Sequence, residues 1–404
     1  IGSVYEQVRV IVEGVRSKGD RFILETSMDL KPGTASSELE VTREEIRQAL
    51  NIVPRPVLDC LKAAAQNIAK FHRAQKPPEM TSMEVSPGIL AGRLTRPLES
   101  VGCYIPGGRA AYPSTLLMTV IPAREAGVDR ITVVTPPGPD MTVNPLVLAA
   151  AHIAGCHRVF KVGGPWAVAA LAFGTATIPR VDKIVGPGNK YVTAAKMLVY
   201  GRVDIDSPAG PSESLILADH TARAGLAAFD FLSQAEHDPD SAAILVTTSQ
   251  ELAVEVCDII SAEFDTLPRK EILAESLSRH SRILLAGDME EAVSFANAYA
   301  PEHLQICTEE PFATLGRIRH AGSIFLGPYS PVAAGDYASG TNHVLPTGRC
   351  ARMFSGLSVD DFIKKPTFQL LSRAGLASIS GTISTLAEEE GLPLHARSVR
   401  SRFE

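Results

Sequence analysis

The sequence lacks the features that mark membrane, secreted and nucleic-acid-binding proteins. No apolar run approaches the roughly 18 to 20 residues that a membrane-spanning helix requires, and no charged segment followed by an apolar one opens the chain as in a signal peptide. Lys and Arg are not in excess, since the formal net charge is −6. That charge disfavours nucleic acids and anionic membranes as partners. We therefore expect neither partner and favour small-molecule chemistry.

Cysteine gives no sign of a disulfide framework or of a reactive thiol. The six cysteines are scattered without a CxxC pair, in a chain too long to need disulfide bonds for stability. None lies in a motif that would activate its thiol. We therefore expect packing residues in a reducing cytoplasm. The chain begins with Ile1 in place of Met, so we expect residues before it to be missing.

Charged residues make up only 21% of the sequence and hydrophobic residues 45%, which is the balance of a well-buried globular protein. The 404 residues suffice for two or three domains. Short β-branched segments alternate with helical segments, which predicts βαβ units and largely parallel sheets. The expected strands are 131–135, 159–162, 183–185 and 214–218 in a first array, and 243–247, 282–285, 304–307 and 323–326 in a second.

Outside these strands the pattern is helical. Residues 4–16 and 42–75 repeat apolar residues three and four apart, as on one face of a helix. Helices are also expected at 249–264 and 289–299. The tail from about residue 358 reads as helices too small for a core of their own, so we expect it to dock on something else. No residue-level similarity between the two arrays supports a duplication.

Side chains of the kind that bind metals recur along the chain. Asp336 and His343 lie in a glycine-punctuated segment, interpreted as a loop that bends around a ligand. Gln234 and His237 are three apart at a predicted helix end and would leave one face, although an exposed helix end has the same pattern. His395 is uninformative alone. Together these donors indicate an enzyme with a bound metal.

Glu302 and His303 form a possible acid–base pair. They follow Pro301 and precede a predicted strand. Neighbouring side chains on a strand point to opposite faces, so an irregular backbone would have to bring both into one pocket. A surface pair at a strand start fits the same residues.

Glycine-rich segments lie at 104–109, 162–165, 185–190 and 208–213. At least two come at or just after expected strands, where open α/β sheets bind nucleotides and helix N-termini can bind phosphate. None spells GxGxxG, so tight turns without a ligand fit equally well. Residues 208–211 equally fit a rigid interdomain hinge.

Seven ordered motifs together closely resemble histidinol dehydrogenases, from about residue 10 to 402. They are residues 101–108, 185–189, 208–212, 233–237, 301–303, 335–347 and 390–395. The resemblance implies an α/β fold with two Rossmann-like parallel-sheet domains, a helical N-terminal region and a small C-terminal helical tail. It also implies a zinc-dependent, NAD-linked four-electron oxidation of L-histidinol through L-histidinal to L-histidine, the last steps of histidine biosynthesis.

The same resemblance implies a zinc site in which every ligand also contacts the substrate. The matching residues are Gln234, His237, Asp336 and His395. Nitrogen and oxygen donors of this kind leave zinc able to take a substrate imidazole and amine, so that the metal orients the carbinol carbon more than it activates it.

Catalytic and substrate-contacting roles are implied for further residues. His303 would touch the substrate and take the alcohol proton, for which an unperturbed imidazole has a suitable pKa. Glu302 would activate water at the aldehyde stage. Ser212, His343 and Glu390 match positions that contact the amino alcohol, and Glu390 would supply a negative partner for its ammonium group.

Tyr104, Trp166 and Asn189 match the residues implied to contact NAD. The family usually has Gln where this chain has Trp166. A large indole can stack on a cofactor ring or fill part of its site, so the cofactor's placement and affinity depend on this residue.

In this family the C-terminal segment reaches the neighbouring subunit of a homodimer, which would explain why a tail without a core carries Glu390 and His395. The active sites would then be shared. The expected domains are 1–104, a helical part packing with the second α/β domain; 105–213, the nucleotide side; 214–357, with the metal and catalytic residues; and 358–404, the tail.

Other functions fit some of the same residues. Related zinc dehydrogenases oxidise other small alcohols such as sulfopropanediol, but a sulfonate should prefer a basic or neutral residue in place of Glu390. A zinc hydrolase would use Glu302 to activate metal-bound water. A third alternative is a protein that keeps the fold and binds a metal or nucleotide without catalysing a reaction. Trp166 is the only residue that points to it.

Overall fold

The computed structural model describes residues 4–107, 111–156 and 158–404, which form two compact units. The large unit holds the described residues up to Gln75 together with Leu98–Phe362. The small unit holds Lys76–Pro97 and Ile363–Glu404. Each unit is therefore assembled from segments far apart in the sequence.

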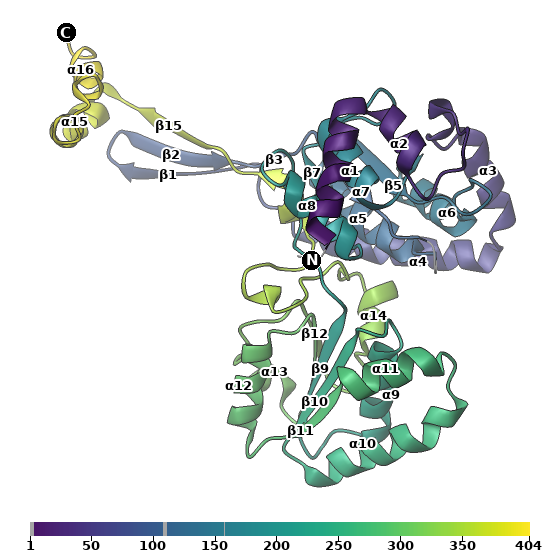
Figure 1. The fold of residues 1–404 in the computed structure, drawn as a ribbon. Helices are drawn as coiled ribbons and strands as arrows, with labels where there is room; N and C mark the ends of the chain where they lie inside the picture. Colours follow the sequence, from purple (N-terminus) through teal and green to yellow (C-terminus); the bar gives the residue numbers. More distant parts are fainter. Residues whose placement is uncertain (1–3, 108–110, 157) are drawn as a thin grey trace. The chain divides into compact units, whose positions relative to one another are not determined.

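Two parallel five-stranded sheets organise the large unit (Figure 1). The first, in spatial order, is β6 (Arg158–Lys161), β5 (Arg130–Thr135), β4 (Ser100–Tyr104), β7 (Lys183–Val185) and β8 (Asp204–Ile205). The second is β11 (Arg282–Leu285), β10 (Ala242–Thr247), β9 (Glu213–Ala218), β12 (His303–Cys307) and β13 (Ser323–Leu326). All eight expected strands are present, but the strand expected at 214–218 in the first array is β9 of the second sheet. Both sheets place their strands in the order third, second, first, fourth, fifth along the chain, the order of the dinucleotide-binding fold.

Two groups of helices pack around the first sheet. One group is α1 (Tyr5–Lys18), α7 (Gly164–Phe173) and α8 (Lys190–Val199); the other is α3 (Arg43–Ile52), α4 (Arg55–Ala74), α5 (Pro113–Ala126) and α6 (Pro145–Ala154). A short helix, α2 (Asp20–Thr26), follows α1. The helix expected over 42–75 is interrupted at Pro54, which precedes α4.

The N-terminal helices pack with the first α/β half, and not with the second as expected. The reason is the apolar stripe of α1, in which Val8, Val12 and Val15 are buried. These side chains belong to the same core as Leu171 of α7 and Val192 of α8. The stripe therefore completes the first half of the large unit.

The second sheet has helices on both faces. Helices α9 (Ala224–Ala235), α10 (Gln250–Glu263) and α11 (Lys270–Arg279) pack together, and α12 (Met289–Tyr299) and α13 (Pro311–Leu315) contact the strands separately. Side chains of β9 alternate between the two cores: Leu215 and Leu217 lie in the core with α12, and Ile216 and Ala218 in the core with α9. A short helix, α14 (Val332–Tyr337), follows β13.

The small unit is not purely helical. Its antiparallel sheet has the order β1 (Met80–Ser86), β2 (Ile89–Leu94), β15 (Thr367–Leu371), and β3 (Arg96–Pro97) pairs with β14 (Ile363–Lys364). Helices α15 (Arg373–Glu389) and α16 (Pro393–Arg400) follow. Two expectations are thereby corrected: residues 80–97 are largely strands, and the tail obtains partners by pairing β15 with β2, because neither segment can form a sheet alone.

No helix in the described residues is both long enough and apolar enough to cross a membrane. The six cysteines all lie in the described part of the chain, and all are free thiols. Burial raises the pKa of the Cys156 thiol to about 11, and it also raises that of Cys103. These two thiols are therefore packing residues, as expected.

A buried ion pair holds the turn that follows β7. Lys196 of α8 forms an ion pair with Asp206, the residue that follows β8, and both side chains are buried. The Lys196 ammonium also donates to the Gly186 carbonyl (3.0 Å), while Asp206 accepts from the Gly186 N–H (2.7 Å). Gly186 has φ +119°, and a Cβ there would overlap the Tyr104 carbonyl, so the turn requires glycine.

Replacing Lys196 with Met should destabilise the protein by about 3–5 kcal/mol, because Asp206 would keep a buried charge without its partner. The midpoint of urea unfolding measures this. Lys270→Met is the matched control, since the ion pair of Lys270 with Asp265 is exposed and worth little. Equal midpoints for the two variants would contradict the assignment.

Candidate functional site

The backbone N–H and carbonyl of Glu213 hold Glu302 and His303 together. Its N–H donates to Glu302 Oε2 (2.9 Å), and its carbonyl accepts from His303 Nδ1 (3.2 Å). Glu302 lies in the bend immediately before β12, and His303 is the first residue of that strand. This supplies the irregular backbone that the adjacent pair needs to share one pocket.

His303 is a buried, neutral imidazole with one nitrogen to spare. Because a carbonyl only accepts, the proton sits on Nδ1 and the lone pair on Nε2. Nε2 is buried, has no hydrogen-bond partner among the described residues, and lies 3.9 Å from Asp336 Oδ1. Burial, and to a lesser extent nearby His237 and His343, lower the pKa of His303 to about 3. The near-neutral pKa expected from an unperturbed histidine is therefore not what the structure shows.

Glu302 is also buried, and burial raises its pKa well above the ordinary carboxyl value. The negative charges of Glu213 and Asp336 raise it further, while hydrogen bonds from the Glu213 N–H and the Ser212 hydroxyl lower it. Its Oε2 lies 3.6 Å from His303 Nδ1. Ser212, predicted to contact substrate, thus touches the predicted water-activating carboxyl.

Gln234 and His237 lie at the end of α9, as the sequence predicted. Gln234 is 2% exposed, and neither its amide oxygen nor its amide nitrogen has a hydrogen-bond partner among the described residues. Such an unpaired buried amide is costly. His237, one turn later, is exposed. The amide oxygen of Gln234 is therefore available to a ligand that the chain does not itself provide.

A hydrogen bond between β12 and α9 indicates that Gln234 lies on the same side of the sheet as His303. Gln305 points to the same face as His303, two residues away, and its amide donates to Asp230 of α9 (2.7 Å). Gln234 follows Asp230 by four residues and shares its face of the helix.

Asp336 lies in the last turn of α14 and not in a loop as expected. Burial raises its pKa to about 6. His343 does lie in a loop, and both of its ring nitrogens are engaged: Nδ1 with the Asp336 carbonyl (3.0 Å) and Nε2 with the Thr115 hydroxyl (3.1 Å). Burial lowers the pKa of His343 to about 4. The ring is thus held neutral beside Asp336, and its predicted substrate contact remains a prediction.

Several residues of this region were not predicted. Glu213 is the most important, because its carboxylate also accepts from the Gly348 N–H (3.0 Å) and so anchors the segment after Thr347. Thr115 positions His343, and Gln305 positions α9 through its hydrogen bond to Asp230. In the sequence the only signal for Glu213 was its place next to Ser212, at the start of an expected strand.

The predicted dinucleotide residues lie at the carboxyl edge of the first sheet. Tyr104 ends β4, and its buried hydroxyl accepts from the Gly164 N–H (3.1 Å). Asn189 caps α8 by accepting from the N–H groups of Tyr191 and Val192. Residues 108–109 of the first glycine segment lie outside the described residues. Tyr104 and Asn189 thus form hydrogen bonds that stabilise the local structure. Their contact with NAD remains a prediction.

Trp166 belongs to the core of the first half. It is 7% exposed, and its indole N–H donates to the Thr26 hydroxyl of α2 (2.8 Å). This contact shows how the core accommodates the polar N–H of the indole.

Glu390 and His395 belong to the small unit. Glu390 caps α15, His395 lies in the first turn of α16, and both side chains are exposed. The four predicted metal ligands are therefore divided between the two units.

Among the described residues, no three His, Cys, Asp or Glu side chains gather as a ready-made metal site. The division of the ligands accounts for this. Of the four predicted ligands, Gln234 is an amide, and His395 lies in the small unit. The large unit therefore contributes only two predicted ligands that are His, Cys, Asp or Glu, namely His237 and Asp336. The chemical types of these predicted ligands, an amide oxygen that is unpaired among the described residues, an imidazole nitrogen and a carboxylate, fit the nitrogen and oxygen donors that zinc accepts.

Comparison with known proteins identifies the chain's relatives. A family model described as histidinol dehydrogenase matches residues 1–403. The histidinol dehydrogenase of Methanothermobacter thermautotrophicus is 55% identical over 403 residues, covering 100% of this chain and 94% of the relative. That of Bacillus cereus is 47% identical, covering 100% and 93%.

Solved structures agree. The crystal structure of histidinol dehydrogenase from Elizabethkingia anophelis has a TM-score of 0.95 at 41% identity, covering 99% of this chain and 92% of that one. An acetylating aldehyde dehydrogenase from Geobacillus thermoglucosidasius has a TM-score of 0.50 at 12% identity, covering 92% and 98%. The second likeness concerns the fold alone.

In the metal-free protein we expect His303 to stay neutral, with its proton on Nδ1, as the pH is lowered from about 8 to about 5, because burial disfavours the charged ring. The ¹⁵N shifts of the imidazole measure both the charge and the tautomer, and His303→Asn identifies the signal. Protonation of Nε2 with a midpoint above about pH 6 would refute this assignment.

Proposed function

Because the chain belongs to the histidinol dehydrogenase family, we propose that it oxidises L-histidinol through L-histidinal to L-histidine with zinc and NAD. The buried Glu302–His303 pair carries this proposal: both side chains are hydrogen-bonded to the backbone of Glu213, and His303 Nε2 is unpaired among the described residues. The two oxidations remove four electrons in all, reduce two NAD molecules and consume one water.

His303 takes the proton in the first oxidation. Its Nε2 holds the lone pair and has no other partner, so the substrate hydroxyl can donate to it as hydride leaves the carbinol carbon. The Glu213 carbonyl keeps the ring in this tautomer. The low pKa of the buried ring leaves it neutral beforehand and favours release of the proton afterwards.

Glu302 serves the aldehyde stage. Its raised pKa moves the carboxyl toward the range in which it can both take and return a proton. A water placed between the aldehyde carbon and Glu302 would lose its proton to the carboxylate. The Ser212 hydroxyl and the Glu213 N–H stabilise the ionised form.

Zinc would be held by Gln234, His237 and Asp336 of one subunit and by His395. When bound, it supplies a positive centre that positions the substrate's imidazole and amine. The unpaired amide of Gln234 supports this site. Glu390 would pair with the substrate ammonium, and His343 would line the same region.

NAD would bind at the carboxyl edge of the first sheet. Tyr104 and Asn189 lie beside turns that follow β4 and β7, the two strands at which the strand order reverses. Trp166, already bonded to Thr26, would shape the neighbouring wall without donating to the cofactor.

We further propose a cytoplasmic homodimer in which the small unit completes the partner's site. Exposed apolar side chains on the small unit support an interface there: Met80, Met83, Val85, Leu370, Leu386, Leu392 and Leu394. The side chains of His395 and Glu390 are exposed on the same unit and so are available to a partner. Free cysteines fit a reducing compartment.

With L-histidinol, the zinc-loaded enzyme should form two NADH per substrate consumed, and prior chelation should abolish the reaction. His303→Asn should lower the rate roughly 10²–10⁴-fold because the proton acceptor is lost, with zinc content near normal. Asp336→Ala should release zinc. Absorbance at the NADH band and metal analysis measure these outcomes.

Loss of zinc from His303→Asn, or full zinc occupancy in Asp336→Ala, would contradict this division of roles. Turnover of sulfopropanediol in place of histidinol would overturn the substrate assignment. Lys270→Met is again the control, since its exposed ion pair lies outside the site.

Sharing of sites predicts complementation between two inactive variants. When Asp336→Ala and His395→Ala subunits are unfolded, mixed equally and refolded, half of the dimers are mixed, and each has one intact site. Activity should recover to about one quarter of the wild-type value. Each variant refolded alone is the control, and no recovery on mixing would show that Asp336 and His395 act within one chain.

A further inference from the structure

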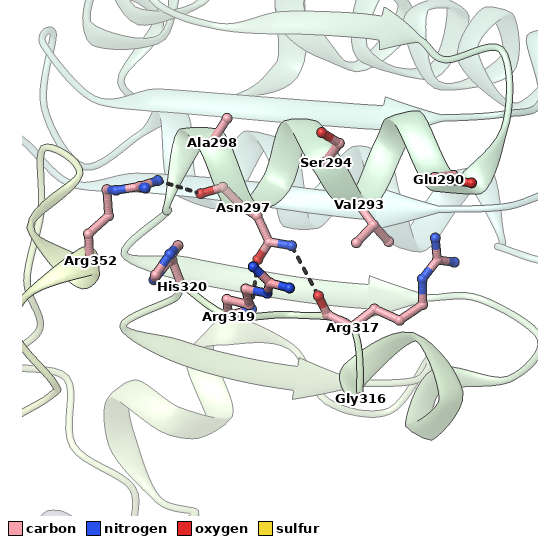
Figure 2. Close-up of a pocket in the computed structure, with 10 residues that line it drawn as sticks. All are labelled: Glu290, Val293, Ser294, Asn297, Ala298, Gly316, Arg317, Arg319, His320 and Arg352. Atoms are coloured by element: carbon pink, nitrogen blue, oxygen red, sulfur yellow. Dashed lines mark hydrogen bonds between the residues drawn. The ribbon is translucent and has the colours of Figure 1, made fainter.

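A basic cavity lies in the second α/β half, and none of its lining residues belongs to the site described above. It is formed by α12, by the segment after α13 and by Arg352 (Figure 2). Its volume is about 600 Å³, within the range of about 300–1,000 Å³ typical of small-molecule sites.

The cavity concentrates positive charge in an acidic protein. Arg317, Arg319 and Arg352 line it together with His320, and the only carboxylate in the lining is Glu290. The lining therefore has a net charge of +2 before His320 is counted, whereas the whole chain carries −6. Such a local field attracts anions.

Asn297 fixes the backbone that carries these side chains. Its amide nitrogen donates to the Arg317 carbonyl (3.0 Å), and its amide oxygen accepts from the Arg319 N–H (2.6 Å). Its own carbonyl accepts from the Arg352 guanidinium (3.1 Å). Figure 2 shows these bonds converging on Asn297 at the centre of the cavity. Hydrogen bonds to Asn297 thus hold the backbone that carries Arg317 and Arg319, and the guanidinium of Arg352.

Neither Arg317 nor Arg319 forms an ion pair or a side-chain hydrogen bond with any other described residue, although many exposed arginines of this chain do. Arg279 and Arg400, for example, pair with Glu275 and Glu388. Gathering unpaired guanidinium groups around one cavity costs free energy through like-charge repulsion, which an anion would remove.

We propose that this cavity binds a small metabolite that carries two phosphate groups. Guanidinium groups match phosphate through paired hydrogen bonds. Figure 2 shows Arg352 and Arg317 toward opposite ends, with Arg319 between them, an extended row that suits two phosphates better than one. A single carboxylate would need only one of the three arginines.

Fructose 1,6-bisphosphate is the probe of this chemistry, titrated by calorimetry into the full-length zinc-loaded protein with saturating NAD present. Saturable binding is expected in the millimolar range or below, weaker with fructose 6-phosphate and weaker at high salt. Arg319→Ala, which keeps the backbone bond to Asn297, should bind at least roughly tenfold more weakly.

Two further variants sharpen the test. Glu290→Gln removes the opposing carboxylate and should tighten binding about two- to fivefold, a gain that misfolding would not produce. Arg223→Ala is the matched control, because Arg223 is exposed in the same half, lies outside the cavity and has no ion pair among the described residues. Absence of saturation in the wild type, equal losses in Arg319→Ala and Arg223→Ala, or competition by NAD would each overturn the proposal.

Discussion

Two hydrogen bonds to the backbone of Glu213 position the candidate catalytic pair. They form because β9 and β12 are adjacent parallel strands in which His303 lies opposite Ser214. The amino ends of both strands meet at one edge, so a carboxyl just before β12 and an imidazole at its first residue reach the backbone of the same residue, Glu213. The sheet register, fixed by two buried apolar faces, therefore sets the tautomer of His303 and the orientation of Glu302.

The same region holds polar groups whose burial opposes folding. Within the described part of the chain, the Gln234 amide and His303 Nε2 have no hydrogen-bond partners. Burial also raises the pKa of Glu302 well above its ordinary value. An unsatisfied buried polar group costs roughly 1–3 kcal/mol. The surrounding cores supply the stability that lets these groups stay ready for a ligand, as expected of a site prepared in advance.

The two sheets share one strand order but place their predicted functional residues at opposite edges. In the first sheet, the turns after β4 and β7 lie at the carboxyl edge, where such folds bind dinucleotides. In the second, the predicted Glu302 and His303 lie at the amino end of β12, next to the amino end of β9; β9 and β12 are the strands equivalent to β4 and β7. The hydroxyl of Thr115, in the first half, is hydrogen-bonded to His343, in the second. This hydrogen bond links the two halves of the large unit.

The sequence by itself determined eight of the ten strands of the two parallel sheets, because their β-branched segments are local signals. It also determined the family, because its motifs are long and ordered. It also placed Gln234 and His237 at a helix end. It did not reveal the sheet of β1, β2 and β15, since β15 lies more than 270 residues from β2, nor the Trp166–Thr26 contact. Only the tertiary structure showed that Glu213 holds the acid–base pair and that burial shifts His303 away from neutrality. These properties come from neighbours distant in the chain and from the exclusion of water, which a local pattern does not record.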